Sequence, residues 1–167
     1  MAKLVLAAGV PHPPRLVFEM QQAPGKIRGE LLMKQVREQV DKAEPDVIIE
    51  VDSDHFVNFF YNNLPSFCIG MAEEAQGPQE DWCPMPRYTV RGHVPFAKAL
   101  YRYGVHDKFD LAAAHELRLD HSLTGAAAFS QSEHASSGGA DLYERVCVAA
   151  AACHALRGTR AHGAPVY

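Results

Sequence analysis

The sequence predicts an α/β fold with a central, largely parallel or mixed sheet flanked by helices. Two apolar runs with strand character, residues 3–9 and 47–51, stand on either side of an amphipathic stretch at residues 26–42. Strand, helix and strand in this order are typical of a right-handed βαβ unit, whose two strands are parallel. The chain has 167 residues, of which 47% are hydrophobic, and this is enough for one domain with a substantial core.

The first part of the chain supports each element in turn. Residues 3–9 are apolar after their first lysine and predict a buried strand, and the proline-rich stretch 11–14 predicts an irregular loop. Residues 26–42 carry apolar side chains near a 3.6-residue period, which predicts a helix that ends before Pro45. Residues 47–51 predict the second strand. In this arrangement the carboxyl ends of both strands lie at one edge of the sheet.

The middle of the chain continues the alternation. We expect a short strand at residues 66–69, a helix at residues 93–103 and a further strand at residues 109–113. Residues 72–91 are interrupted by glycine and proline and predict a long loop. A loop of that length in a compact domain is usually a lid or a binding loop.

The composition changes near residue 124. Residues 130–140 are small and polar, residues 141–156 are rich in alanine and predict a helix, and residues 157–167 are expected to be disordered. We therefore divide the chain into a structured part, residues 1–124, and an atypical tail rich in alanine, serine and glycine, residues 125–167.

Charge and motifs exclude several classes of protein. The formal net charge is −4 and no basic stripe is present, so nucleic-acid binding is not expected. No apolar run approaches the ~20 residues of a membrane span, and no secretory signal precedes the first strand, so we expect a cytoplasmic protein. The four cysteines form no CxxC pair, which argues against a disulfide framework or structural zinc. No nucleotide-binding or serine-hydrolase motif occurs.

Two histidines follow the first two predicted strands. His12 and His55 would meet at one sheet edge, where ligands bind in open α/β sheets. They are either surface loop residues or two ligands of one divalent metal. With a carboxylate they would form the facial triad of non-haem Fe(II). Asp54 adjoins His55 and is expected to act by orienting a ligand, while Asp52 is an alternative metal ligand.

Two further residues are candidates for the same edge. His121 follows a third strand-like segment, and it is either an acid–base or substrate-contacting group or a loop histidine bonded to Asp120. Trp82, in the long loop, either lines a pocket for an aromatic substrate or packs the loop.

Several stretches together resemble the class III extradiol ring-cleaving dioxygenases, most closely those related to the catalytic β subunit of protocatechuate 4,5-dioxygenase. The matching stretches are His12 with its prolines, residues 47–55, residues 63–70, Trp82 to His93 and residues 119–124. The resemblance implies Fe(II)-dependent cleavage of a catecholic acid, such as protocatechuate or gallate, by O2. It also implies that His12 and His55 bind the iron and that His121 lies near substrate and oxygen.

The chain departs from that family in its tail. The resemblance places a third iron ligand, a glutamate, and an acid–base histidine beyond residue 167, so residues 1–124 correspond to the N-terminal part of the catalytic domain. Read one nucleotide later, residues 140–157 can encode a family-like strand followed by prolines and an Arg-Cys pair. We therefore expect a truncated or frameshifted C-terminus, and little or no dioxygenase activity from these 167 residues alone.

Other functions remain open at this stage. The chain could be a non-enzymatic, Memo-like module that binds a metal or a partner through its histidines, or an inactive fragment. If it is an enzyme, the resemblance implies a small α subunit or a second copy of the chain as a partner. The aromatic substrate and oligomeric state are not predicted.

Overall fold

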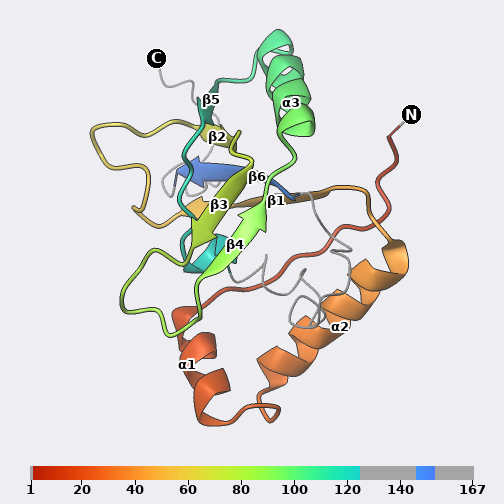
Figure 1. Cartoon of the computed structure of the whole chain (residues 1–167), viewed down its shortest axis with the longest axis vertical. Helices are drawn as coiled ribbons and strands as arrows, with labels where there is room; N and C mark the ends of the chain where they lie inside the picture. The colour runs from red at the N-terminus through yellow and green to blue at the C-terminus, as the bar shows by residue number, and fades with distance from the viewer. Residues whose placement is uncertain (1, 125–145, 153–167) are drawn as a thin grey trace, which may run out of the picture.

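The computed structural model describes residues 2–124 and the backbone of a strand at residues 146–152. The named elements, in chain order, are α1 (Pro14–Gln22), α2 (Arg28–Ala43), β1 (Ile48–Asp54), β2 (Phe67–Gly70), β3 (Glu74–Gly77), β4 (Tyr88–Arg91), α3 (Val94–His106), β5 (Leu111–Ala114) and β6 (Val146–Ala152). Figure 1 shows α3 at one end of the molecule, α1 and α2 at the other, and the strands between them. Within the described part, no helix has the length and apolar character needed to cross a membrane.

The larger sheet has the strand order β1–β6–β2–β5. β1 is parallel to β6 and β2 is parallel to β5, whereas β2 and β6 are antiparallel. β3 and β4 form a separate antiparallel pair. A mixed sheet with helices beside it confirms the predicted fold class.

Helix α3 covers the β2–β5 end of the larger sheet. The His93 side chain accepts a hydrogen bond from the Phe96 backbone N–H at 3.2 Å, which satisfies a free donor at the helix start. A Cβ atom at Gly104 would collide with the Leu111 side chain, so glycine lets the helix approach β5 closely. β2 and β5 are thus a parallel pair with a helix in their connection.

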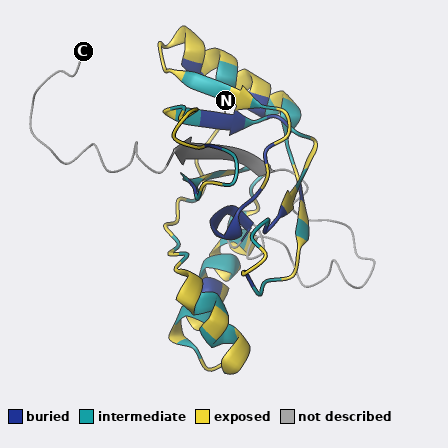
Figure 2. Ribbon diagram, turned by 90° about the vertical axis from the view of Figure 1, so that its left-hand side faces the viewer, coloured by how far each residue is buried: buried dark blue, intermediate teal, exposed yellow. Residues whose placement is uncertain are grey.

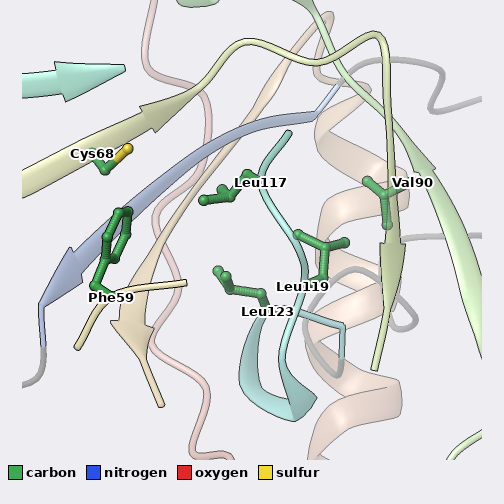
Figure 3. Close-up of a cluster of buried hydrophobic side chains, with 6 residues drawn as sticks. All are labelled: Phe59, Cys68, Val90, Leu117, Leu119 and Leu123. Atoms are coloured by element: carbon green, nitrogen blue, oxygen red, sulfur yellow. The ribbon is translucent and has the colours of Figure 1, made fainter. Parts of the chain in front are cut away.

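The main core lies around the sheets and the segment that follows β5. Its buried side chains come from β2, β4 and the connecting segments, and Figure 3 shows them together: Phe59, Cys68, Val90, Leu117, Leu119 and Leu123. Figure 2 shows buried positions concentrated here, whereas α2 buries only Met33. Leu119 and Leu123 are both fully buried, and they anchor the turn between them.

The first predicted strand is wrong. Residues 3–9 form no strand, and Leu4 and Val5 are 82% and 48% exposed. A strand needs a neighbour to satisfy its backbone groups, and β1 pairs with β6. The expected βαβ unit of residues 3–9, α2 and β1 therefore does not form, although α2 and β1 themselves are confirmed.

Two further expectations need correction. The sequence predicts a loop throughout residues 72–91, but β3 and β4 lie towards the two ends of this stretch and residues 78–87 connect them. The alanine-rich stretch 141–156 predicts a helix, but residues 146–152 are strand β6. This strand pairs with β1 on one side and β2 on the other, and this pairing overrides the helix propensity of alanine. The expectations for residues 130–140 and 157–167 lie outside the described residues. The short strand at 66–69, the helix at 93–103 and the strand at 109–113 are confirmed as β2, α3 and β5.

Candidate functional site

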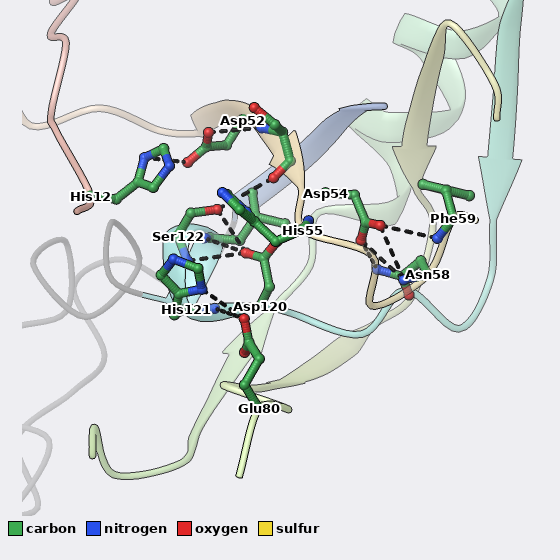
Figure 4. Close-up of polar contacts among 12 residues, drawn as sticks. His12, Asp52, Asp54, His55, Asn58, Phe59, Glu80, Asp120, His121 and Ser122 are labelled. Carbon is green, nitrogen blue, oxygen red and sulfur yellow. Dashed lines mark hydrogen bonds and ion pairs between the residues drawn. The ribbon is translucent and has the colours of Figure 1, made fainter. Parts of the chain in front are cut away.

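Three imidazoles gather beside the carboxyl end of β1. His12 lies just before α1, His55 directly follows β1, and His121 lies in the buried turn between Leu119 and Leu123. The ring centroids of His12 and His55 are 5.2 Å apart, those of His55 and His121 are 4.6 Å apart, and those of His12 and His121 are 6.0 Å apart. The three histidines singled out from the sequence therefore form one cluster, which Figure 4 shows.

Each imidazole in this cluster has a carboxylate beside its Nδ1 atom. The Nδ1 atom of His12 lies 3.3 Å from Asp52 Oδ2. The Nδ1 atom of His55 lies 3.0 Å from Asp120 Oδ2, and that of His121 lies 2.7 Å from Glu80 Oε1. A carboxylate at one ring nitrogen orients the ring and leaves the other nitrogen for a ligand, which is the arrangement found behind histidines that bind metals.

Asp120 is the most heavily bonded of these carboxylates. Its Oδ2 atom accepts from the backbone N–H of His55 at 2.8 Å as well as contacting the ring. Its Oδ1 atom accepts from the backbone N–H and hydroxyl of Ser122, at 3.0 and 2.7 Å, and from the backbone N–H of Leu123 at 3.1 Å. Asp120 therefore caps the turn that carries His121 and at the same time orients His55.

These hydrogen bonds shift the pKa values of both Asp120 and His55. Burial by itself raises the pKa of Asp120, but the hydrogen bonds from His55, Ser122 and the backbone outweigh it and lower that pKa to about 2. The hydrogen bond to Asp120 raises the pKa of His55, and partial burial of the ring opposes it. The two groups therefore favour each other's charged forms.

The Asp54 carboxylate bonds to the backbone turn after His55 and not to a histidine ring of the cluster. Its buried carboxylate accepts hydrogen bonds from the backbone N–H of Asn58 at 3.1 Å, from Asn58 Nδ2 at 2.7 Å and from the Phe59 backbone N–H at 3.0 Å. These bonds close a turn in which Phe56 has φ 59°, a left-handed conformation that costs a bulky residue energy. Asp54 thus shapes the backbone after His55, and the carboxylates at the ring nitrogens are Asp52, Asp120 and Glu80.

The loop at residues 78–87 brings an aromatic side chain to the cluster. The ring centroid of Trp82 is 5.0 Å from that of His121 and 6.4 Å from that of Phe18 in α1, and Trp82 is half-exposed. Gln21 of α1 donates a hydrogen bond to the carbonyl oxygen of Pro84 at 2.9 Å. The loop therefore rests on α1 and places a half-exposed indole ring beside His121.

Comparison with known families gives a match over most of the described chain. Residues 6–125 match the family described as the catalytic LigB subunit of aromatic ring-opening dioxygenase. The chain belongs to this family. The three clustered histidines, their three carboxylates and Trp82 all lie within the matched residues.

Relatives of this LigB-family chain include curated proteins named 2,3-dihydroxyphenylpropionate/2,3-dihydroxicinnamic acid 1,2-dioxygenase. The protein from Photorhabdus laumondii is 30% identical over 99 residues, which cover 56% of this chain and 28% of the relative. The protein from Paraburkholderia phymatum is 28% identical over 123 residues (71% and 34%), and that from Rhodococcus globerulus is 30% identical over 112 residues (66% and 34%). The matches span about a third of each relative's length.

Sequence reasoning missed Glu80. It lies 41 positions from His121 in a loop without periodic pattern, so no spacing rule connects the two. The only sequence signal is an acidic residue within a loop already suspected of contacting ligands. The sequence offers Asp52 as an alternative metal ligand, and in the structure it contacts the Nδ1 atom of His12.

Proposed function

We propose that this LigB-family chain contributes to the extradiol cleavage of a catecholic aromatic acid by O2, with Fe(II) as the cofactor. The observation that carries the proposal is the cluster of three carboxylate-paired histidines within the residues that match the family. His12 and His55 would bind the iron, His121 would contact the substrate hydroxyl and exchange its proton, and Trp82 would pack against the substrate ring.

The donor set suits two of the three positions of a facial triad. Asp52 and Asp120 contact the Nδ1 atoms of His12 and His55, so their Nε2 lone pairs are available to a divalent ion. Among residues 2–124, no group of three histidine, cysteine, aspartate or glutamate side chains is arranged to hold a metal. In this proposal the third position belongs to a carboxylate outside the described residues, as the family resemblance implies.

In this mechanism the chain's own residues bind, orient and move a proton. The ferrous ion, when bound, would supply a positive charge that draws the catechol oxygens and O2 together. His121 is buried and its Nε2 atom has no hydrogen-bond partner within the described structure, so it can accept a proton from a hydroxyl placed against it. Trp82, half-exposed beside His121, would offer an aromatic ring for the catechol to pack against.

The finer parts of the proposal concern substrate, partner and location. The names of the relatives favour 2,3-dihydroxyphenylpropionate, and protocatechuate and gallate are the alternatives that the resemblance implies. We also propose a cytoplasmic location and, as a partner, a small α subunit or a second copy of the chain. We expect little or no turnover from these 167 residues alone, because residues 2–124 hold no group of three side chains arranged to bind a metal.

Anaerobic reconstitution with Fe(II) tests the proposal. Each of the three catechols is added in turn, and the iron-dependent change in catechol absorption is recorded before O2 uptake and formation of the ring-opened product are followed. We expect iron-dependent catechol binding that is lost in His12→Ala and His55→Ala and kept in His106→Ala, an exposed histidine at the end of α3. Absence of iron-dependent binding with all three catechols would overturn the proposal.

A further inference from the structure

Glu80 and His121 make a buried two-point contact. One oxygen, Glu80 Oε1, lies 3.1 Å from the backbone nitrogen of His121 and 2.7 Å from its ring Nδ1 atom. The exposed fractions of the two side chains are 11% and 4%. The next residue, Asp81, has a side chain that is 99% exposed. Two adjacent acidic residues thus have opposite environments, and only the first reaches the histidine cluster.

The backbone holds Glu80 in this place. Leu119 donates its N–H to the Gln76 carbonyl oxygen at 3.2 Å and accepts from the Gln79 N–H at 3.0 Å. A Cβ atom at Gly77 would collide with the Leu119 carbonyl oxygen and with Thr124, so glycine lets β3 lie directly against the segment that carries His121. The start of the loop is therefore fixed in register with residues 119–124, and Glu80 does not depend on a long flexible reach.

This geometry determines which nitrogen of His121 carries the proton. Glu80 Oε1 accepts a hydrogen bond from the backbone N–H of His121, and an oxygen of a carboxylate can only accept. With Glu80 as a carboxylate, Nδ1 of His121 is therefore the donor at 2.7 Å. A proton on Nε2 as well would bury a charged donor without an acceptor, since no hydrogen-bond partner lies beside Nε2 within the described structure.

We propose that Glu80 is a positioning residue that holds His121 as the neutral Nδ1–H tautomer, with the Nε2 lone pair free for a ligand hydroxyl. Figure 4 shows the second ring nitrogen on the side of the ring away from Glu80. That the hydroxyl belongs to a catechol rests on the proposed function, whereas the tautomer and its cause do not. Without Glu80 the ring would lose both its preferred tautomer and its orientation.

Heteronuclear NMR on the full chain, labelled with ¹⁵N in its histidines, measures the tautomer directly. Two-bond correlations between ring protons and ring nitrogens distinguish a protonated from an unprotonated nitrogen, and His121→Gln assigns the signals. We expect an Nδ1–H tautomer in the wild type. Free imidazole side chains favour the proton on Nε2, so finding that tautomer at His121 in the wild type would overturn the inference without any variant of Glu80.

Variants at Glu80 then test the cause. Glu80→Gln keeps an oxygen that the backbone N–H of His121 fixes in place, so it should retain the Nδ1–H tautomer. Glu80→Leu has a similar size but no acceptor and should shift His121 towards Nε2–H. Asp81→Asn removes an acidic charge one position along and should change nothing. An unchanged tautomer in Glu80→Leu would contradict the proposed role of Glu80, and circular dichroism checks that each variant is folded.

A separate measurement distinguishes this inference from the proposed function. The catechol probe is 2,3-dihydroxyphenylpropionate, added with Fe(II) under anaerobic conditions. We expect Glu80→Leu to weaken its binding at least tenfold and Glu80→Gln to restore most of it. Binding that is equal in wild type and Glu80→Leu would overturn the positioning role. That comparison requires measurable binding to the wild type. If the wild type has the Nδ1–H tautomer but binds neither this probe nor protocatechuate nor gallate, the proposed function fails and the assignment of Glu80 rests on the tautomer measurements alone.

Discussion

His55 and Asp120 are joined twice through a single oxygen. Asp120 Oδ2 lies 2.8 Å from the backbone nitrogen of His55 and 3.0 Å from its Nδ1 atom. The carboxylate therefore fixes both the place where the chain leaves β1 and the direction in which the imidazole points. Because Asp120 also caps the turn containing His121, one side chain sets the relative position of two histidines from distant parts of the sequence.

The His55–Asp120 pair should make the free energy of unfolding depend on pH in the acid range. The pKa of Asp120 falls from an ordinary value of 3.8 to about 2 in the folded chain, so the unfolded chain takes up its proton first as pH falls. The contribution is present above pH 4, amounts to about 2 kcal/mol, and is lost as pH falls towards 2. Denaturant titrations of the wild type between pH 5 and pH 2 should show this loss. Asp120→Asn should be less stable at pH 5 and show a shallower dependence; an equally steep curve would contradict the assignment.

The turn after His55 should depend on Asp54. Asp54→Ala would leave the part-buried backbone N–H of Asn58 and the buried backbone N–H of Phe59 without their acceptor, and we expect a loss of about 2–4 kcal/mol in the free energy of unfolding. Asp46→Ala, at an exposed position before β1, is the matched control and should change it by less than about 0.5 kcal/mol. Equal effects of the two substitutions in denaturant unfolding would show that the turn does not need Asp54.

Trp82 should contribute to the affinity for the catechol but not to the affinity for Fe(II). Trp82→Ala removes the indole beside His121, and we expect catechol affinity to fall about tenfold, which corresponds to about 1.4 kcal/mol of lost aromatic contact. Fe(II) affinity should stay the same, because Trp82 has no metal-ligating atom. Tyr103→Ala, which removes a 70% exposed aromatic ring from α3, is the control. A parallel loss of Fe(II) and catechol binding would indicate that Trp82 supports the whole site.

Metal affinity should be low. Two imidazoles without a third ligand among the described residues should bind Fe(II) with a dissociation constant above about 1 µM, which corresponds to a binding free energy weaker than about −8 kcal/mol. Anaerobic calorimetry on the full chain measures this value, and His12→Ala should abolish the remaining heat. A sub-micromolar constant would mean that Asp52, another carboxylate or a second chain completes the coordination.

The elements predicted correctly are those with strong local patterns. Helix α2 follows from its 3.6-residue period and the proline after it, and β1, β2 and β5 follow from short apolar runs. Residues 3–9 have the same apolar character but form no strand, because a strand exists only when another backbone pairs with it. Composition likewise favours a helix where β6 lies, since the pairing of β6 with β1 and β2 is not visible in a local stretch of sequence.

The same division holds for the site. His12, His55 and His121 could be identified because each follows an apolar segment and the topology of α/β folds gathers such ends. Their meeting did not require the predicted βαβ unit, since His12 reaches the cluster from an irregular segment. The pairing of Glu80 with His121 depends on how the β3–β4 hairpin lies against Leu119, which is a tertiary relationship without a sequence pattern.

The place of β6 in the sheet has a consequence for the order of folding. β2 and β5 pair across 44 positions, from Phe67 to Leu111, whereas β1 and β6 pair across 98, from Ile48 to Val146. Closing a longer loop costs more chain entropy, and such distant pairings tend to form late. The half of the sheet with β2, α3 and β5 should therefore assemble first. β1 leads into His55 and can pair with β6 only after residues 146–152 have reached the sheet. The histidine cluster should therefore be among the last features to become ordered.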